Sequence, residues 1–491
     1  MSRRWLFADQ LGPHFLDAPD QQVLLIESQA VFRRRRFHRQ KAHLVLSALR
    51  HRAAELGEQA EFRQVDRYAP SVRRSRGELS VCAPTSYAAR SFVSTLPVEV
   101  LPARGFATGE DEFARWAEGR GQRRLLLEDF YRQARQRHDL LMDGDEPAGG
   151  RWNLDADNRE PPPKGAERLG VPEPWWPAED EIDAGVRHDL DRWEAAGAVS
   201  FVGRDAPRWV AATRAEALHV LRDFVEHRLP AFGPHEDAML AGDAWMAHSL
   251  LSVPLNLGLL DPLEVVARVE TAYRSGAVPL ASAEGFVRQV IGWRDYVWNI
   301  YWHVGPNYRS RNALAAGRSV PAWFSSLDAD AVEARCLSDV LAGVRDRGWV
   351  HHIPRLMVLG NYALQRGWDP AEVTDWFHRS FLDGYDWVML PNVVGMSQHA
   401  DGGLMATKPY AAGGAYINRM SDYCGSCPYS PAKRVGPSAC PYTAGYWWFL
   451  SRNAGRLAGN HRMAQPLAGL RRLTDLDALV EQEAGRGSAA P

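Results

Sequence analysis

Two kinds of periodicity divide the chain, and this division constrains the fold more than any other feature. In residues 1–135, short apolar runs at 5–8, 23–26, 62–65 and 98–101 alternate with amphipathic stretches such as 38–56 and 111–119. Strands that alternate with helices predict a parallel sheet with helices on both faces. From residue 191 onward the pattern is helical almost throughout. The predicted fold class is therefore an α/β, Rossmann-like N-terminal domain followed by a larger all-α domain.

Composition gives the domain boundaries. Residues 136–190 are dense in Pro and Gly and lack periodicity, which predicts an interdomain linker between domains 1–135 and 191–491. Helix starts are predicted in the second domain by Thr213 with Glu216, a capping box, and by Asp261-Pro262 and Asp369-Pro370. Residues 485–491 (GRGSAAP) are expected to be disordered.

Polar residues follow the first two predicted strands. Asp9 and Gln10 come after the first strand, and Glu27 comes after the second. In parallel sheets, ligands bind at the carboxyl ends of the strands, so these three are candidate ligand contacts. The alternative, that they are ordinary turn and cap residues, is equally compatible with the pattern.

The bulk properties restrict the class of protein. A formal net charge of −2 gives no sign of nucleic-acid binding, so any such binding must come from a local basic patch. The N-terminus lacks the apolar run of a signal peptide, and no run of about 18 apolar residues predicts a membrane span. Five cysteines at uneven spacing argue against a disulfide framework. A cytoplasmic protein without membrane association is expected.

Four cysteines form a candidate metal site. Cys424, Cys427 and Cys440 stand close together in a loop-rich segment (424–440), and Cys336 is the natural candidate for a fourth ligand. Four thiolates suit a structural zinc ion and a [4Fe-4S] cluster alike, and unrelated buried thiols are a third possibility. The fifth cysteine, Cys82, is interpreted as a buried apolar residue.

Several long motifs carry a family resemblance. Residues 248–258 (HSLLSVPLNLG), 286–296 (FVRQVIGWRDY), 348–357 (GWVHHIPRLM) and 385–392 (YDWVMLPN) resemble the flavin-binding half of photolyases and cryptochromes. Residues 149–159, 392–403 and 407–424, together with the four cysteines, resemble the bacterial branch of that family that carries an iron–sulfur cluster. The resemblance extends over essentially the whole chain apart from the tail.

The resemblance implies three prosthetic groups. FAD is expected in the helical domain, a [4Fe-4S] cluster on Cys336, Cys424, Cys427 and Cys440, and the antenna 6,7-dimethyl-8-ribityllumazine near Asp9, Gln10 and Glu27. Trp376 falls where the branch carries an aromatic electron relay to the flavin. The expected flavin contacts are Ser249, Leu250, Leu251, Ser252, Gln289, Trp293, Arg294, Tyr296, Arg355, Tyr385, Asp386 and Asn392.

The resemblance also implies a reaction, the light-driven repair of (6-4) pyrimidine photoproducts in UV-damaged DNA by a monomeric enzyme. This repair needs proton transfer, for which histidine is suited. His351 and His352 are adjacent on a predicted helix, so their side chains diverge by about 100°. Tyr410 is a further catalytic candidate. From the pattern alone, the histidines also fit a solvent-exposed helix end. Phosphate contacts are expected from Lys433, Arg434, Arg452, Arg456, His461 and Arg462, although a solvated charged surface fits this cluster equally well.

Two other functions remain open. Met389 stands where the family leads us to expect an acidic residue facing the flavin N5 region, and a thioether accepts no strong hydrogen bond. This departure favours a cryptochrome-type blue-light photoreceptor with the same cofactors and little repair activity. A light-independent, zinc-stabilised nucleic-acid-binding protein is a third candidate.

Overall fold

A computed structural model describes residues 3–75 and 77–491 of the chain. Its N-terminal part contains a five-stranded sheet in the order β3-β2-β1-β4-β5, and every neighbouring pair is parallel. β2 is buried along its whole length, as expected for a strand covered on both faces. The α/β prediction is confirmed. The strands are β1 (Arg3–Leu6), β2 (Val23–Ser28), β3 (Ala60–Val65), β4 (Leu79–Cys82) and β5 (Glu99–Leu101).

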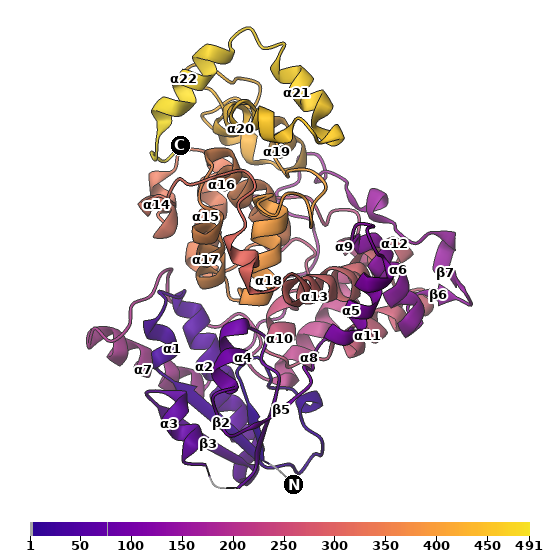
Figure 1. Ribbon diagram of the computed structural model, residues 1–491, viewed down its shortest axis with the longest axis vertical. Coiled ribbons are helices and arrows are strands. Elements are labelled where there is room, and N and C mark those ends of the chain that lie inside the picture. The colour runs from indigo at the N-terminus through magenta and orange to yellow at the C-terminus, as the bar shows by residue number, and fades with distance from the viewer. Residues whose placement is uncertain (1–2, 76) are drawn as a thin grey trace.

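Four helices lie between the strands of this sheet, whereas the next two helices belong to the other half of the molecule. α5 packs against α13, and α6 packs against the segment 288–294, so both lie among the C-terminal helices in Figure 1. The helices before the segment 136–190 are α1 (Ala30–Arg33), α2 (Arg39–Leu56), α3 (Tyr68–Arg73), α4 (Tyr87–Val93), α5 (Glu110–Gly119) and α6 (Leu127–His138).

The segment expected to be a linker contains a two-stranded hairpin, β6 (Met142–Asp143) and β7 (Glu146–Pro147), and ends in α7 (Glu181–Ala195). α7 packs along α2 and so attaches the connection to the sheet domain. The segment therefore wraps around the molecule, while the boundaries at 135 and 190 stay predictions.

The rest of the chain is helical, which confirms the second half of the predicted fold class. The capping box at Thr213 and the helix starts at Asp261 and Asp369 form as predicted. None of the helices in the described part of the chain is long and apolar enough to cross a membrane. The helices are α8 (Arg214–Asp223), α9 (Leu229–Phe232), α10 (Ser252–Asn256), α11 (Pro262–Arg274), α12 (Leu280–Val287), α13 (Asp295–Val304), α14 (Ala322–Ser325), α15 (Arg335–Arg347), α16 (Asn361–Arg366), α17 (Pro370–Ser380), α18 (Asp386–Leu390), α19 (Gly414–Met420), α20 (Pro441–Leu457), α21 (Ala464–Leu470) and α22 (Leu476–Arg486).

The C-terminal tail is ordered, so the expectation of disorder is wrong. The carbonyl oxygen of Pro491 accepts hydrogen bonds from the amides of Glu333 (2.7 Å) and Ala334 (3.0 Å), just before α15. Trp323 Nε1 donates to the carbonyl of Ser488 at 2.9 Å. Composition predicted disorder because it does not reveal that the carbonyl groups of the tail accept hydrogen bonds from donors in a distant segment.

Four π-helical turns interrupt the helices of the C-terminal half, at Phe224–Arg228, Arg288–Arg294, Pro354–Gly360 and Pro391–Ser397. Such turns are rare and occur frequently at functional sites. Three of the four contain residues expected to contact a flavin, namely Gln289, Trp293, Arg294, Arg355 and Asn392.

Candidate functional site

A cavity of about 440 Å³ opens at the carboxyl ends of β1 and β4, where the strand order of the sheet reverses. This is the position at which doubly wound sheets bind ligands. α2 and the start of α4 form one side of the cavity, and Tyr385 and Asp386 at the start of α18 form the other. The cavity therefore lies between the sheet domain and the helical half.

Charged side chains line this cavity, those of Asp9, Arg35, Lys41, Arg309 and Asp386. Asp9 accepts a hydrogen bond from Thr85 Oγ1 at 2.5 Å, and burial raises the pKa of its carboxyl. Lys41 donates from Nζ to the carbonyls of His378 (2.7 Å) and Gly384, and burial lowers its pKa to about 7. Aromatic and aliphatic side chains make up most of the remaining lining, so the cavity suits a planar ligand that also carries polar groups.

Of the three predicted antenna contacts, the cavity brings in only Asp9. Gln10 is buried and donates to the carbonyl of Cys82 at 3.0 Å. Glu27 is also buried and accepts two hydrogen bonds from Arg50 at 2.8 and 2.9 Å. Both side chains thus stabilise the sheet domain, which is the alternative that the sequence pattern left open.

Tyr385 and Asp386, expected as flavin contacts, line the cavity with Asp9. Asp386 accepts a hydrogen bond from Tyr301 at 2.9 Å and pairs with Arg309. Tyr385 N donates to the carbonyl of Asp383 at 3.1 Å, so the cavity adjoins the surroundings of Asp383 at this residue.

The segment 249–252 forms a tight turn before α10. Leu250 has a φ of +58°, an uncommon conformation for a residue with a side chain, and Leu251 N donates to Ser249 Oγ at 3.3 Å. Ser252 Oγ then donates to Asp383 at 2.7 Å. The turn is thereby fixed against a carboxylate that lies 131 residues further along the chain.

Asp383 is the centre of a polar group of three segments. Arg355 donates to both of its carboxylate oxygens, at 2.8 and 3.0 Å, and Asn256 donates to its backbone carbonyl at 3.1 Å. The Arg355 guanidinium also lies 4.3 Å from the centre of the Phe381 ring. Arg355 was predicted from the sequence and Asp383 was not, because a single acidic residue in the run FLDGYDW has no distinctive spacing.

The remaining predicted flavin contacts differ in their surroundings. Arg294 donates to the carbonyls of Gly105 (2.8 Å) and Leu255 (3.3 Å), and burial lowers its pKa to about 10. Tyr296 is buried and donates to the carbonyl of Leu125, which is a structural role. Asn392 donates to the carbonyl of Val388. Gln289 and Trp293 are half-buried on the π-helical turn.

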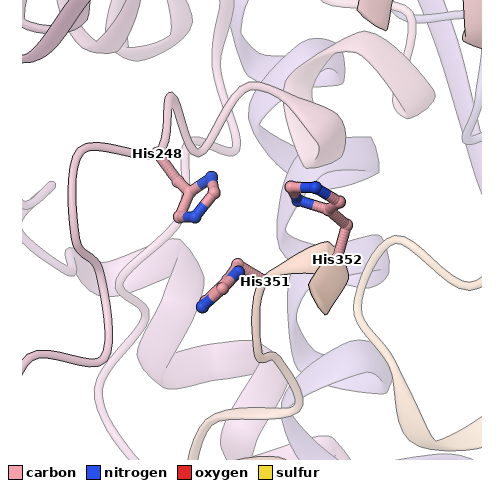
Figure 2. A group of neighbouring side chains, drawn as sticks. All are labelled: His248, His351 and His352. Carbon is pink, nitrogen blue, oxygen red and sulfur yellow. The ribbon is translucent and has the colours of Figure 1, made fainter. Parts of the chain in front are cut away.

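Three histidines converge beside the turn 249–252 (Figure 2). His351 and His248 are 5% and 7% exposed, and their rings stack at 4.2 Å between centroids with an interplanar angle of 22°. His352 is exposed, and its Nε2 lies 3.4 Å from a carboxylate oxygen of Asp237. The predicted divergence of His351 and His352 is thus observed, one ring pointing inward and the other toward solvent. His248 opens the motif 248–258, but a lone histidine gave no reason to assign it a role.

Burial sets the protonation of the inner pair. It lowers the pKa of His248 and of His351 well below the ordinary value, and the charges of neighbouring His352 and Arg355 act in the same direction. Both rings are therefore neutral at pH 7. Burial also raises the pKa of Glu236, which precedes Asp237, to about 7.

The surface around His352 unites distant parts of the chain. Tyr410 is 36% exposed, and Tyr416 is half-buried close enough to Asp237 and Arg159 for both charges to act on its hydroxyl. Burial, followed by the charge of Asp237, raises the pKa of Tyr416 to about 12. The segments 149–159, 348–357 and 407–424 thus meet here, although the sequence separates them by up to 250 residues.

The basic residues expected to contact phosphate are partly engaged within the protein. Arg434 pairs with Asp475 at 2.8 Å. Arg452 donates to the carbonyl of Gln365 at 2.5 Å and lies 4.1 Å from the centre of the Trp448 ring. These two side chains stabilise the C-terminal helices.

The four cysteines are brought together. Burial raises the pKa of Cys336 well above its ordinary value, and the charges of Cys440, Cys424 and Cys427 add to this effect. Four thiols that lie this close together can hold a zinc ion or an iron–sulfur cluster.

Trp376 begins a row of aromatic rings. Its ring lies 4.4 Å from Phe324, which lies 4.7 Å from Trp368, and Trp368 lies 6.2 Å from half-buried Trp323 (all between ring centroids). Trp376 is 1% exposed and donates from Nε1 to the carbonyl of Phe324. The row connects the interior to the surface near the C-terminal tail.

Comparisons with known proteins agree with the fold described above. A family model described as "Deoxyribodipyrimidine photo-lyase-related protein" matches residues 4–199. A protein named (6-4) photolyase from Agrobacterium fabrum is 39% identical over 499 residues, which cover 96% of this chain and 95% of that protein. An uncharacterized protein of Acanthamoeba polyphaga mimivirus is 50% identical over 54 residues, 11% of this chain and 44% of that protein.

Among solved structures, a bacterial class III photolyase from Agrobacterium tumefaciens matches with a TM-score of 0.54 at 14% identity, covering 84% of this chain and 82% of that chain. At that identity, the match shows the shared fold. Together with the near-full-length relative, it leads to one conclusion about descent. The chain belongs to the photolyase-related protein family.

Proposed function

We propose that the protein repairs (6-4) pyrimidine photoproducts in DNA under blue light, with reduced FAD as electron donor and histidine-assisted proton transfer. The observation that carries the proposal is the histidine pair, with His351 buried and neutral and His352 exposed beside Asp237. A lesion base extruded from the duplex needs a proton donor at the wall of its pocket. The 39% identity to a protein named (6-4) photolyase supports the same reaction.

FAD fits the residues around the turn 249–252. The buried Arg294 guanidinium has an Nε atom without a hydrogen-bond partner in the described chain, and it is anchored to the carbonyl of Leu255 beside that turn. A buried cation with a free donor suits the flavin's diphosphate. The Arg355–Asp383 pair holds Ser252 of the same turn. When bound, FAD supplies light-driven electron transfer, and the protein supplies its position and the surrounding charges.

In this proposal, side chains of the protein hold and transfer the proton that repair requires. His352 is the proton donor of this proposal, and Asp237, 3.4 Å from its Nε2, orients the ring. His351 is kept neutral by burial and supports the ring of His248 by stacking. Tyr410 and Tyr416 contribute hydroxyl and aromatic surface at the rim of the pocket.

Two further groups are part of the proposal. Cys336, Cys424, Cys427 and Cys440 hold a [4Fe-4S] cluster, which their mutual proximity supports. The antenna 6,7-dimethyl-8-ribityllumazine occupies the 440 Å³ cavity, whose aromatic walls and polar side chains suit a small planar chromophore with polar substituents. In this assignment Tyr385 and Asp386 contact the antenna instead of the flavin. Trp376 starts the electron relay, continued by Trp368 and Trp323.

Met389 favours a second candidate, a cryptochrome-type photoreceptor with the same cofactors. Its side chain is 5% exposed within the apolar core of the helical half. A buried thioether offers the flavin no strong acceptor, which alters flavin redox behaviour and thereby favours signalling over repair.

One assay distinguishes the photolyase from the photoreceptor. Anaerobically purified protein is mixed with an oligonucleotide that carries one (6-4) photoproduct and is illuminated with blue light. Restored thymines in the light and not in the dark establish repair. In that case His352→Asn lowers the repair rate by about 100-fold or more, whereas the exposed control His303→Asn leaves it unchanged. Flavin that photoreduces while the lesion persists refutes repair and selects the photoreceptor.

A further inference from the structure

The three histidines have the composition of a transition-metal site. One ring nitrogen from each of His248, His351 and His352 lies within 4.8 Å of the other two. Imidazole nitrogen is a preferred ligand of Zn²⁺, and three histidines with one open position are an established zinc-binding arrangement. Zn–N bonds of about 2.0–2.1 Å place such nitrogens about 3.3 Å apart, so small side-chain rotations close the site.

The inner rings have free ligand atoms. His248 Nε2 and His351 Nδ1 are buried and have no hydrogen-bond partner among the residues that the structure describes. A buried polar atom without a partner costs free energy, which a bound cation recovers.

The third ring has the support expected of a metal ligand. Asp237 lies 3.4 Å from His352 Nε2, which leaves Nδ1 as the second ring nitrogen. Histidine ligands commonly donate their other N–H to a carboxylate, which orients the ring and strengthens its ligand atom. Figure 2 shows the rings of His248 and His352 on either side of His351.

Acidic side chains offset part of the positive charge around the site. Arg355 donates two hydrogen bonds to Asp383, and His352 lies beside Asp237. Arg228, whose charge acts on His248, is held by the backbone carbonyls of His248, Trp245 and Met246. A second group of potential metal ligands, His51 with Asp180 and Asp183, is less suited to a cation because an arginine already binds one of its carboxylates. There Arg208 donates to both oxygens of Asp183 at 3.1 and 3.0 Å and occupies them.

We propose that His248, His351 and His352 form a site that binds one Zn²⁺ ion. An ion held there occupies the Nδ1 lone pair of His352, the ring that donates the proton in repair, so the nitrogen is no longer available for proton transfer and the ion inhibits repair reversibly. This inhibitory consequence rests on the proposed function, whereas the binding itself does not.

Binding is measured in the dark and without DNA. Flavin- and cluster-loaded protein is treated with a chelator, exchanged into buffer, and titrated with Zn²⁺ against a colorimetric zinc indicator. We expect one site per chain, with affinity at least tenfold lower in His248→Asn and in His352→Gln. The exposed control His227→Asn keeps the wild-type affinity. Co²⁺ gives the visible spectrum of nitrogen ligands without the intense thiolate charge transfer expected from the cysteine loop.

Equal Zn²⁺ affinity in wild-type, His248→Asn and His352→Gln proteins overturns the proposal, as does a thiolate spectrum with Co²⁺. His352 is exposed, so its variant tests the site even if His248→Asn fails to fold. In the repair assay, Zn²⁺ slows wild-type turnover and a chelator restores it. Binding without this inhibition refutes the inhibitory role, while absence of repair under all conditions refutes only the proposed function.

Discussion

Asp383 stabilises the proposed flavin site by joining two segments, because its carboxylate binds both the turn 249–252 and the π-helical turn 354–360. We predict that Asp383→Asn leaves Arg355 as a mostly buried guanidinium without its charge partner. Removing one member of such a pair costs about 3 kcal/mol or more of unfolding free energy. FAD released per mole of purified protein should fall several-fold. Asp386→Asn is the matched control, because Asp386 lies at the interdomain cavity, and equal FAD loss in both variants contradicts the prediction.

Asp183 gives the protein a pH-dependent contribution to stability. Its burial alone acts to raise the carboxyl pKa, but hydrogen bonds from His51 and Arg208 outweigh burial and hold the pKa well below its usual range. A carboxyl whose pKa is lowered by folding stabilises the protein above the unfolded pKa of about 3.9 and loses this effect as the pH falls below it.

Asp183→Asn is therefore expected to lower the unfolding free energy by about 3–5 kcal/mol at pH 7, and by progressively less below about pH 4. Urea denaturation at a series of pH values measures this difference. Asp191→Asn on the same helix, whose side chain is 65% exposed, should shift the urea midpoint little at any pH. A wild-type advantage that persists undiminished at pH 3 excludes this account.

At the scale of elements, the C-terminal segment stabilises the start of α15, the helix that carries Cys336. The Pro491 carbonyl accepts from two backbone amides there, and α22 is fixed by the buried pair Arg366–Glu483. Deleting residues 488–491 should lower stability by about 1–3 kcal/mol through lost hydrogen bonds and reduce iron retained after purification. Thermal denaturation and iron content measure these effects. Ser488→Ala, which keeps the backbone carbonyl bonded to Trp323, should behave as wild type.

At the scale of the whole molecule, the cavity exists because two domains meet. Val45 on α2 lines it, and Val45→Trp should fill it. We expect the extracted protein to lose the antenna chromophore and to keep its FAD, as measured by chromatography of released cofactors. Ala54→Trp is the control, because Ala54 is exposed on the same helix. Loss of FAD together with the antenna in Val45→Trp contradicts the separation of the two sites.

The sequence by itself determined the features that depend on near neighbours. Alternation of short apolar runs gave the parallel sheet, and the capping box at Thr213 and the proline-led helix at Asp369 form where predicted. These signals succeed because a strand period or a helix cap involves residues within about four positions of one another. Helix geometry likewise predicted that the side chains of His351 and His352 diverge, and in the structure one is buried and the other exposed.

Only the tertiary structure decided which distant residues share a site. It placed Tyr385 and Asp386 with Asp9 in one cavity, stacked His248 on His351, and ordered the tail against α15. It also gave Gln10 and Glu27 structural partners within the sheet domain. The physical reason is that these contacts join segments about 100 to 380 residues apart, or satisfy buried polar groups, and both are settled by how the whole chain packs.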